Sequence, residues 1–280
     1  MHLAPPEPLP WERLDGFTFS TRAGDDLDAD PRITAYLDTV AFIEDLDLST
    51  IKSDRVIAMA ADSDAPLESW NVFRCIVFET REEGVLYALT AGDWYSVSAS
   101  FADEVLRFGH ELPRLDLALP PAPAGVEEKD YNQTAADALD ALSLDRELVV
   151  TPAGDSIELC DLLTRNRQLI HVKKRGSSST LSHLFSQGVV SAELLARESA
   201  FRTSARERAA GLDLEYENVL PERRPDRDEW EVGFVVITRS HRDTPLTLPF
   251  FSVVNLRSAA LRLQDLGYRV SVRQVNEDVP

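Results

Sequence analysis

Apolar and polar positions in the second half of the chain alternate with the periods of helices and strands. Residues 127–142 carry apolar side chains at helical spacing. Three short runs rich in Ile, Leu and Val follow at 145–150, 157–161 and 169–174, and residues 164–167 have the composition of a hairpin turn. We therefore expect one helix and then three strands, the last two joined as a hairpin.

The pattern continues with helices and two further strands. A Ser/Thr cap at the start of residues 179–188 begins a helix, and more helix is expected over 191–211. Residues 231–238 are almost wholly apolar, as in a strand buried on both faces in a mixed sheet. A helix over 251–267 and an alternating edge strand over 268–275 complete the order αβββαβαβ. The protein is expected to be α+β overall, with a C-terminal α/β domain.

The first half of the chain predicts a separate α+β unit. Residues 31–46 and 99–112 have the period of amphipathic helices. Three strand-like runs at 71–79, 84–90 and 93–98 are separated by turn sequences, which indicates a β-meander. The aromatic residues of this meander are more typical of a core than of a ligand platform.

Prolines mark the boundary between the two halves. Four prolines between residues 113 and 123 interrupt both helix and ladder hydrogen bonding. We therefore expect an acidic N-terminal unit at 1–112, a linker at 113–124 and an α/β domain at 125–280.

Composition indicates a globular protein. With 280 residues and 44% hydrophobic residues, the chain can form one large or two small cores. No apolar run approaches the roughly 18 residues of a membrane-spanning helix, and the first residues lack the features of a signal peptide. We expect a cytoplasmic protein without a membrane partner. Cys75 and Cys160 lie in apolar runs, which favours buried free thiols over a disulfide or a zinc site.

Charge is distributed unevenly along the chain. The formal net charge is −19, which disfavours a nucleic-acid partner because polyanions are bound by Lys and Arg. Residues 1–126 hold 23 acids and 9 bases, a net of −14, whereas residues 127–280 hold 25 and 20, a net of −5. Residues 165–208, the basic stretch, carry nine bases and three acids, a local +6. This stretch is either a binding surface or an ordinary solvated helix face.

An acid and a base lie on the two strands of the expected hairpin. Asp161 belongs to the first strand. His171 and Lys173 share one face of the second strand, because side chains alternate along a strand. The acid thus faces a His-x-Lys sequence on its neighbour. This arrangement suits a site that holds a metal ion and a phosphate.

The element order and these residues resemble the PD-(D/E)XK nuclease fold, whose core runs αβββαβ. The resemblance implies that acids on the first helix and on the second and third strands hold Mg²⁺ or Mn²⁺, while the lysine orients or activates water. Carried over residue by residue, it assigns Glu128, Asp161 and Lys173. His171 stands where the third carboxylate is usual, and Cys160 stands where a proline is usual. An imidazole in place of a carboxylate weakens a Mg²⁺ site or favours Mn²⁺.

Glu128 shares a helix face with two further residues. Tyr131 and Asn132 follow it at i+3 and i+4, so they lie beside it. In the nuclease interpretation they pack and hydrogen-bond next to a metal-binding acid. In the alternative, Glu128 is only an acid near the positive end of the helix dipole.

The start of the helix after the hairpin also has two interpretations. Its free backbone N–H groups, with basic residues just before them, form a candidate phosphate-binding site. The residues of this candidate site are Lys174, Arg175, Ser178, Ser179 and Thr180. Equally, the hydroxyl groups serve only as helix caps. Ser182 and His183 are adjacent and point in different directions on a helix, so no hydrolytic pair is expected.

A second resemblance covers more of the chain. It rests on the segments EEKDYN, IELCDLL, LIHVKK, SSSTLSHLFSQGVVSAELL and LPFFS. These segments are similar to a family of sporadically distributed bacterial proteins, known as a domain of unknown function, from about Trp70 to the C-terminus. Members tend to be longer at the N-terminus. Their patchy distribution implies mobile elements or defence against phage.

Two functions follow from these observations. The first is a metal-dependent nuclease in which Glu128 and Asp161, with His171, hold an ion that activates water, while Lys173 stabilises the phosphorane charge. The second is a non-catalytic relative that docks DNA, RNA or a protein partner on the same sheet and the basic stretch. The acidic N-terminal unit is a further candidate surface for a protein partner, or a shield over the basic stretch.

Overall fold

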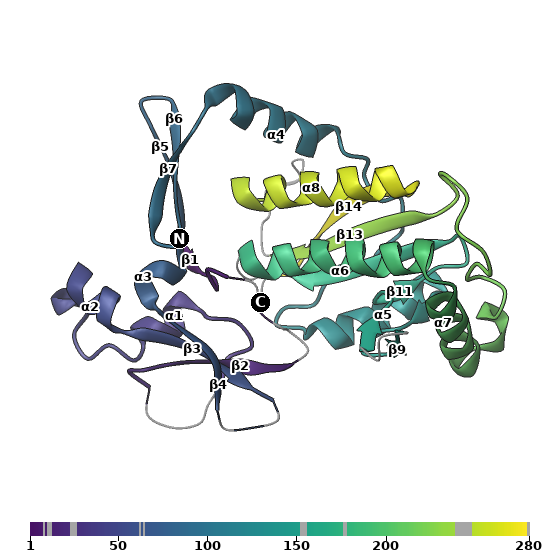
Figure 1. The fold of residues 1–280 in the computed structure, drawn as a ribbon, viewed down its shortest axis with the longest axis horizontal. Helices are drawn as coiled ribbons and strands as arrows, with labels where there is room; N and C mark the ends of the chain where they lie inside the picture. Colours follow the sequence, from purple (N-terminus) through teal and green to yellow (C-terminus); the bar gives the residue numbers. More distant parts are fainter. Residues whose placement is uncertain are drawn as a thin grey trace. The chain divides into compact units, whose positions relative to one another are not determined.

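Two compact units make up the chain in the computed structural model (Figure 1). The structure describes residues 1–7, 9, 13–22, 27–61, 63, 65–151, 156–175, 178–238 and 248–278, without the side chains of Asp45, Ser178 and Ser179. Unit 1 comprises residues 1–104 and 176–180, and unit 2 comprises residues 105–175 and 181–280. Helices and several sheets occur together, so the protein is α+β, as the sequence predicted.

Unit 1 contains two antiparallel sheets. Their strand orders are β1-β5-β6-β7 and β2-β3-β4. The strands are β1 (His2–Leu3), β2 (Leu14–Phe19), β3 (Arg55–Ala60), β4 (Pro66–Asn71), β5 (Ile76–Glu82), β6 (Val85–Thr90) and β7 (Asp93–Val97). The antiparallel run β5-β6-β7 confirms the predicted meander, but the first predicted strand, 71–79, is helical over Val72–Cys75 and becomes β5 only from Ile76. Cys75 is a buried free thiol, as is Cys160 in unit 2.

The single helix predicted over residues 31–46 is wrong. The segment and the residues after it contain α1 (Ile33–Leu37), η2 (Ile43–Asp45) and α2 (Leu48–Ser53). Thr39 Oγ1 donates to the carbonyl oxygen of Tyr36 at 2.6 Å, which occupies an acceptor that the next turn of α1 would need. A side-chain hydrogen bond therefore competes with the helix. Two further helices are α3 (Val72–Cys75) and α4 (Ala99–Glu111), and α4 confirms the second prediction for this half.

A five-stranded mixed sheet forms the centre of unit 2. Its order is β14-β13-β12-β11-β8. The strands are β8 (Leu142–Ser143), β11 (Leu162–Leu163), β12 (Gln168–Lys174), β13 (Glu231–Thr238) and β14 (Arg269–Asn276). β12, β13 and β14 are parallel, whereas β8, β11 and β12 pair antiparallel. β13 is an interior strand between β12 and β14, and β14 lies at the edge, as predicted.

Helices cover both faces of this sheet. Apolar residues of α6 (Ser178–Arg197) and α8 (Phe250–Leu266) pack with Leu169 and Phe234 on one face (Figure 1). Residues of α5 (Glu128–Leu139) pack on the other face. The remaining helices are α7 (Ser199–Leu212) and η3 (Leu214–Tyr216). Among the described residues, no helix is both long enough and apolar enough to cross a membrane.

The strands predicted at 145–150 and 157–161 have a different arrangement from the one expected. They supply β9 (Leu148–Val150) and β10 (Ser156–Glu158), which pair only with each other. The main sheet instead uses β8 before this hairpin and β11 after it. Asp161 therefore lies in a bend just before β11 and not within a strand. The hairpin turn between β11 and β12 is confirmed.

The segment expected to be a linker lies along the edge of the unit 2 sheet. Arg114 forms a parallel bridge with Val272, and Ala122 forms one with Glu277. Leu115 is fully buried within the apolar cluster that contains α5. The prolines limit regular pairing, yet the apolar residues between them pack against β14. Residues 113–124 thus contribute to the core of unit 2.

α6 runs without a break through Gly188. A Cβ atom at this position would lie 2.6 Å from Cε1 of Phe234 and 3.3 Å from Cδ2 of His171. The glycine therefore permits close approach of the helix to β13.

We expect Gly188→Ala to lower the free energy of unfolding by about 1 kcal/mol. Overpacking a core destabilises a protein by about 1–3 kcal/mol, whereas the higher helix propensity of alanine stabilises the helix by up to about 1 kcal/mol relative to glycine. Gly211→Ala is the matched control, since nothing lies within 4 Å of its Cβ. The control should raise stability slightly. Urea unfolding of the three proteins measures both changes, and equal stability of the two variants would contradict the close approach.

Candidate metal centre

A polar pocket of about 200 Å³ lies in unit 2 near the end of β12. It is lined from α5, the turn before β9, β10, the bend before β11, β12 and α6. The lining residues are Glu128, Lys129, Asp145, Arg146, Glu158, Asp161, Val172, Lys173 and Gln187. Glu128, Asp161 and Lys173, which the sequence singled out, therefore reach one pocket.

Three carboxylates converge in this pocket. Asp145, Glu158 and Asp161 each offer an oxygen, and these oxygens all lie within 4.8 Å of one another. Within the described ranges this is the one group of three or more acidic, His or Cys side chains close enough to share an ion. Carboxylate oxygens are the ligands that Mg²⁺ and Mn²⁺ prefer. The sequence analysis missed Asp145 and Glu158.

Asp161 is the most buried acid of the group, with 8% of its surface exposed. Its Oδ2 accepts a hydrogen bond from the backbone N–H of Val172 at 2.7 Å. Burial raises the pKa of Asp161 well above its usual value, and the negative charge of Glu158 raises it further, whereas the Val172 hydrogen bond lowers it. Buried like charges this close need a cation or a proton between them.

Glu158 has the same tendency. Burial raises its pKa, and the nearby charge of Asp145 adds to this. The backbone N–H of Arg146 donates to Glu158 Oε1, and Lys173 also lowers its pKa. Two of the three acids thus bind a proton more readily than carboxyl groups in water do.

These raised pKa values predict a pH dependence of stability. Asp161 and Glu158 hold protons in the folded chain that they release in the unfolded chain, so the free energy of unfolding should fall as pH rises above about 4 and through their folded-state pKa values. Asp161→Asn should make the free energy of unfolding decrease less as pH rises. Urea unfolding at about pH 5 and about pH 8 measures the effect. An identical pH dependence in both proteins would contradict a raised pKa at Asp161.

Glu128 binds two lysines of β12 and lies outside the group of three carboxylates. Its Oε1 accepts from Lys173 Nζ at 2.8 Å, and its Oε2 accepts from the backbone N–H of Lys174 at 2.9 Å. Glu128 thus fixes the position of Lys173 at the pocket. Its role as a metal ligand stays a prediction.

The two residues expected beside Glu128 are both buried. Tyr131 donates its hydroxyl to the carbonyl oxygen of Pro120 at 3.1 Å and packs in the core. Asn132 donates from Nδ2 to Asp161 Oδ1 at 3.3 Å. Asn132 Oδ1 is buried and accepts from no residue that the structure describes. Asn132 therefore contacts the site directly, whereas Tyr131 packs beneath it.

His171 lies in the core and does not line the pocket. Its ring centroid is 6.0 Å from that of Phe234. Burial lowers its pKa to about 3, so the imidazole is neutral, and its Nε2 bonds to no described residue. The position at which the nuclease resemblance expects an acid is thus closed by α6, while Glu158 brings a carboxylate from another element.

Two of the candidate phosphate-binding residues at the start of α6 have partners within the protein. Lys174 Nζ donates to the carbonyl oxygen of Val126 at 3.0 Å and to Glu277 at 2.9 Å. Thr180 donates its hydroxyl to Asp30 in unit 1 at 2.9 Å. Arg175 is exposed, and the side chains of Ser178 and Ser179 lie outside the described part of the structure. The phosphate-binding role of these residues stays a prediction.

Most cations of the basic stretch are paired with acids. Seven of its nine bases form ion pairs. These are Arg165, Arg167, Lys173, Lys174, Arg197, Arg206 and Arg208. Arg202 is buried and donates to the carbonyl oxygens of Leu195 and Glu222. Among the described residues, most of the local +6 is therefore offset by acids, and all of these acids except Glu193 come from outside the basic stretch.

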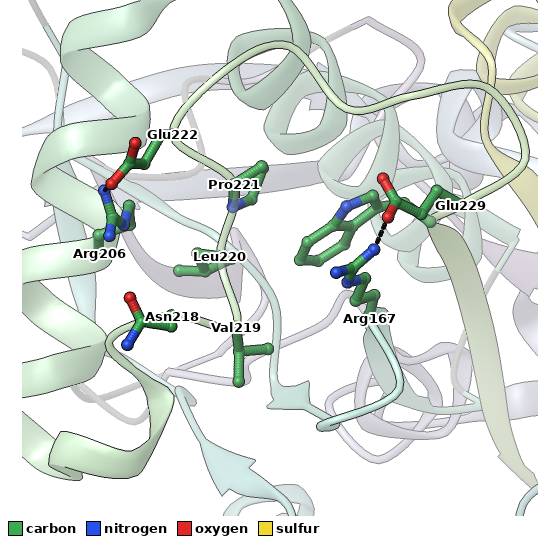
Figure 2. A pocket seen from close by; sticks show the side chains of 9 residues that line it. Arg167, Arg206, Asn218, Val219, Leu220, Pro221, Glu222 and Glu229 are labelled. Carbon is green, nitrogen blue, oxygen red and sulfur yellow. Dashed lines mark ion pairs between the residues drawn. The ribbon is translucent and has the colours of Figure 1, made fainter.

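A second pocket, of about 220 Å³, lies at the opposite end of β12 (Figure 2). It is lined by Arg167, Arg206, Asn218, Val219, Leu220, Pro221, Glu222, Glu229 and Trp230. Arg167 pairs with Glu229, and Arg206 pairs with Glu222 at 2.9 Å. Both guanidinium charges are thus already offset, which makes this pocket the weaker candidate for an anionic ligand.

The fold and the pocket define an α+β protein with a buried group of carboxylates and a lysine beside a mixed sheet. The chain belongs to a family of unknown function, DUF6119, whose model matches residues 1–276. This confirms the predicted family membership and extends the similarity to the residues before Trp70. No curated protein and no solved structure matches the chain.

Proposed function

We propose that the protein is a nuclease that uses a divalent cation to hydrolyse phosphodiester bonds. One observation carries this proposal: Asp145, Glu158 and Asp161 converge in the pocket that Lys173 also lines. The three carboxylates would hold Mg²⁺ or Mn²⁺ through oxygen ligands. A bound ion of this kind lowers the pKa of water and polarises a phosphoryl oxygen.

The protein side chains divide the remaining tasks. Lys173 would offset the negative charge that develops on the phosphorus oxygens, since a fixed cation in a partly buried pocket stabilises charge more than one in water. Glu128 holds Lys173 in place through its 2.8 Å ion pair. Asn132 holds Asp161 through its amide. The carboxylates carry a net negative charge that a cation must neutralise before a phosphate can approach.

The order of elements supports the same proposal. α5, β8, β11, β12, α6 and β13 follow the αβββαβ order of the nuclease core that the sequence resembles, with the β9-β10 hairpin inserted after β8 and with α7 and η3 inserted after α6. In this chain the third acid would come from the β9-β10 hairpin, because Glu158 belongs to β10, and not from residue 171. A cytoplasmic enzyme of this kind would suit defence against phage or the biology of mobile elements.

Cleavage of defined substrates tests the proposal. Single- and double-stranded DNA and RNA are incubated with the purified protein and Mg²⁺, Mn²⁺ or a chelator. We expect cleavage of at least one substrate that depends on the added ion. No cleavage of any substrate with either ion would contradict the proposed function.

The pairing of the basic stretch favours a second candidate, a non-catalytic binding module. With seven bases in ion pairs, little free positive charge remains to draw a polyanion to the pocket. In that case the carboxylates would hold a structural cation. Binding of a partner without cleavage, together with a cation-dependent rise in stability, would identify this function.

A further inference from the structure

β7 lies at one edge of the four-stranded sheet in unit 1, and β1 lies at the other. It follows β6 through a two-residue turn, Ala91–Gly92, in which both residues have positive φ, at 53° and 90°. Such a turn makes Thr90 and Asp93 a hydrogen-bonded pair, and they are paired in the register. This pair determines which of the later pairs along the hairpin are hydrogen-bonded and which are not.

Hydrogen-bonded and non-hydrogen-bonded pairs alternate along antiparallel strands. Ala88 and Tyr95 therefore bond each other, whereas Trp94 and Ser96 direct their backbone N–H and C=O groups away from β6. No bond from these outward groups to another described residue is present. β7 thus offers two donors and two acceptors to a further strand.

The two faces of β7 differ in chemistry. Trp94 is 55% exposed, lies in a cross-strand row with Leu89 and Phe78, and makes an edge contact with the Phe78 ring. Tyr95 is 49% exposed and lies in the row of Ala88 and Glu79. Asp93 shares the face of Tyr95. One face of the edge is apolar and aromatic, and the other carries Tyr95 together with two acids, Asp93 and Glu79, and one base, Arg81.

Charge restricts the partner. Residues 76–97 hold four acids, Glu79, Glu82, Glu83 and Asp93, against one base, Arg81. A polyanion would be repelled by this surface. A second copy of β7 would bring the same net negative charge to the edge, which also disfavours self-pairing. The surface instead complements a strand that carries basic side chains on one face.

We infer that β7 is a docking edge for an extended segment of a protein partner in which apolar and basic residues alternate. The segment would pair with the outward backbone groups of Trp94 and Ser96, as in strand addition to an open sheet edge. Its apolar side chains would lie beside Trp94, and its basic side chains beside Tyr95 and Asp93. This inference does not depend on the proposed nuclease activity.

A pair of synthetic peptides tests the inference on the full chain. One peptide of about eight residues alternates lysine and valine, and the other has the same composition with the lysines in one block and the valines in another. We expect the alternating peptide to bind about tenfold more tightly in isothermal titration calorimetry, because it alone can match both faces while paired with β7. Equal affinity of the two peptides would overturn the inference.

Variants of Ser96 show whether the backbone edge is the binding site. Ser96→Pro removes the outward N–H, which an edge strand tolerates, and should weaken binding of the alternating peptide about fivefold or more. Ser96→Ala keeps the N–H and should bind like the wild type. Unchanged binding by Ser96→Pro would overturn the inference. So would self-association of the wild type that Ser96→Pro abolishes, since the occupant would then be a second copy.

Discussion

Asp161→Asn is expected to abolish cation-dependent cleavage while the chain stays folded. The substitution removes a buried carboxylate from the group that would hold the ion. Loss of an outer partner of a metal site already costs about 10–100-fold in affinity or activity, and loss of a direct ligand should exceed this. Rates of cleavage with Mg²⁺ and Mn²⁺ measure the effect. We expect a loss of more than about a hundredfold with both ions.

The fold should survive this change because both hydrogen bonds can be kept. The oxygen of the new amide can accept from the Val172 N–H, as Asp161 Oδ2 does at 2.7 Å. Its nitrogen can donate to Asn132 Oδ1 after the Asn132 amide rotates, since that oxygen has no partner among the described residues. Removal of a buried acid with a raised pKa also removes a source of instability at neutral pH.

Asp137→Asn is the matched control for this prediction. Asp137 is an exposed acid on α5 and accepts from Gln133 at 2.9 Å, away from the pocket lining. The control should cleave like the wild type. Equal rates for wild type, Asp161→Asn and Asp137→Asn would show that the activity comes from a contaminant or another site.

Lys173→Met is expected to reduce the cleavage rate by about 10²–10³-fold, because it removes the fixed cation that would stabilise the developing charge. The ion should still bind, since Lys173 is not one of the converging carboxylates. Stability should change little, because the ion pair with Glu128 is partly exposed and such pairs contribute at most about 1 kcal/mol. Activity and stability therefore separate at this residue.

Lys52→Met removes the same charge from unit 1 and serves as the control. We expect it to leave the cleavage rate and the dependence on Mg²⁺ unchanged. If Lys173→Met cleaves at the wild-type rate, Lys173 has no part in the chemistry. If Lys173→Met instead loses cation binding, Lys173 is needed to maintain the structure of the ion site. Its role would then not be to stabilise the charge that develops during cleavage.

The sequence predicted the parts of the site that lie on regular elements. The helical spacing of 127–142 placed Glu128 on α5, and the apolar run at 169–174 placed Lys173 on β12. Both patterns are strong because one face of each element packs against the core. The interior position of β13 followed in the same way from its almost wholly apolar composition.

The rest of the site depends on irregular structure that has no sequence period. Residues 159–161 bend the chain between β10 and β11, which turns Glu158 and Asp161 toward one pocket. If residues 158–161 formed a regular strand, Glu158 and Asp161 would point to opposite faces, because side chains three residues apart on a strand do so. The strand predicted for this segment therefore gave no reason to expect that the two acids converge. The sequence did contain one indication of the carboxylate group, because the acid Glu158 lies only three residues before Asp161. Charge counting failed for the basic stretch because its partners are distant in sequence, as in Lys174 with Glu277.

The position of a bound ion tests the central claim most directly. Crystals grown with Mn²⁺ and measured at the manganese absorption edge show the ion as an anomalous peak. We predict one peak among the carboxylates of Asp145, Glu158 and Asp161, and its loss in Asp161→Asn. An ordered pocket without a peak, or a peak that persists in Asp161→Asn, would contradict the proposed metal centre.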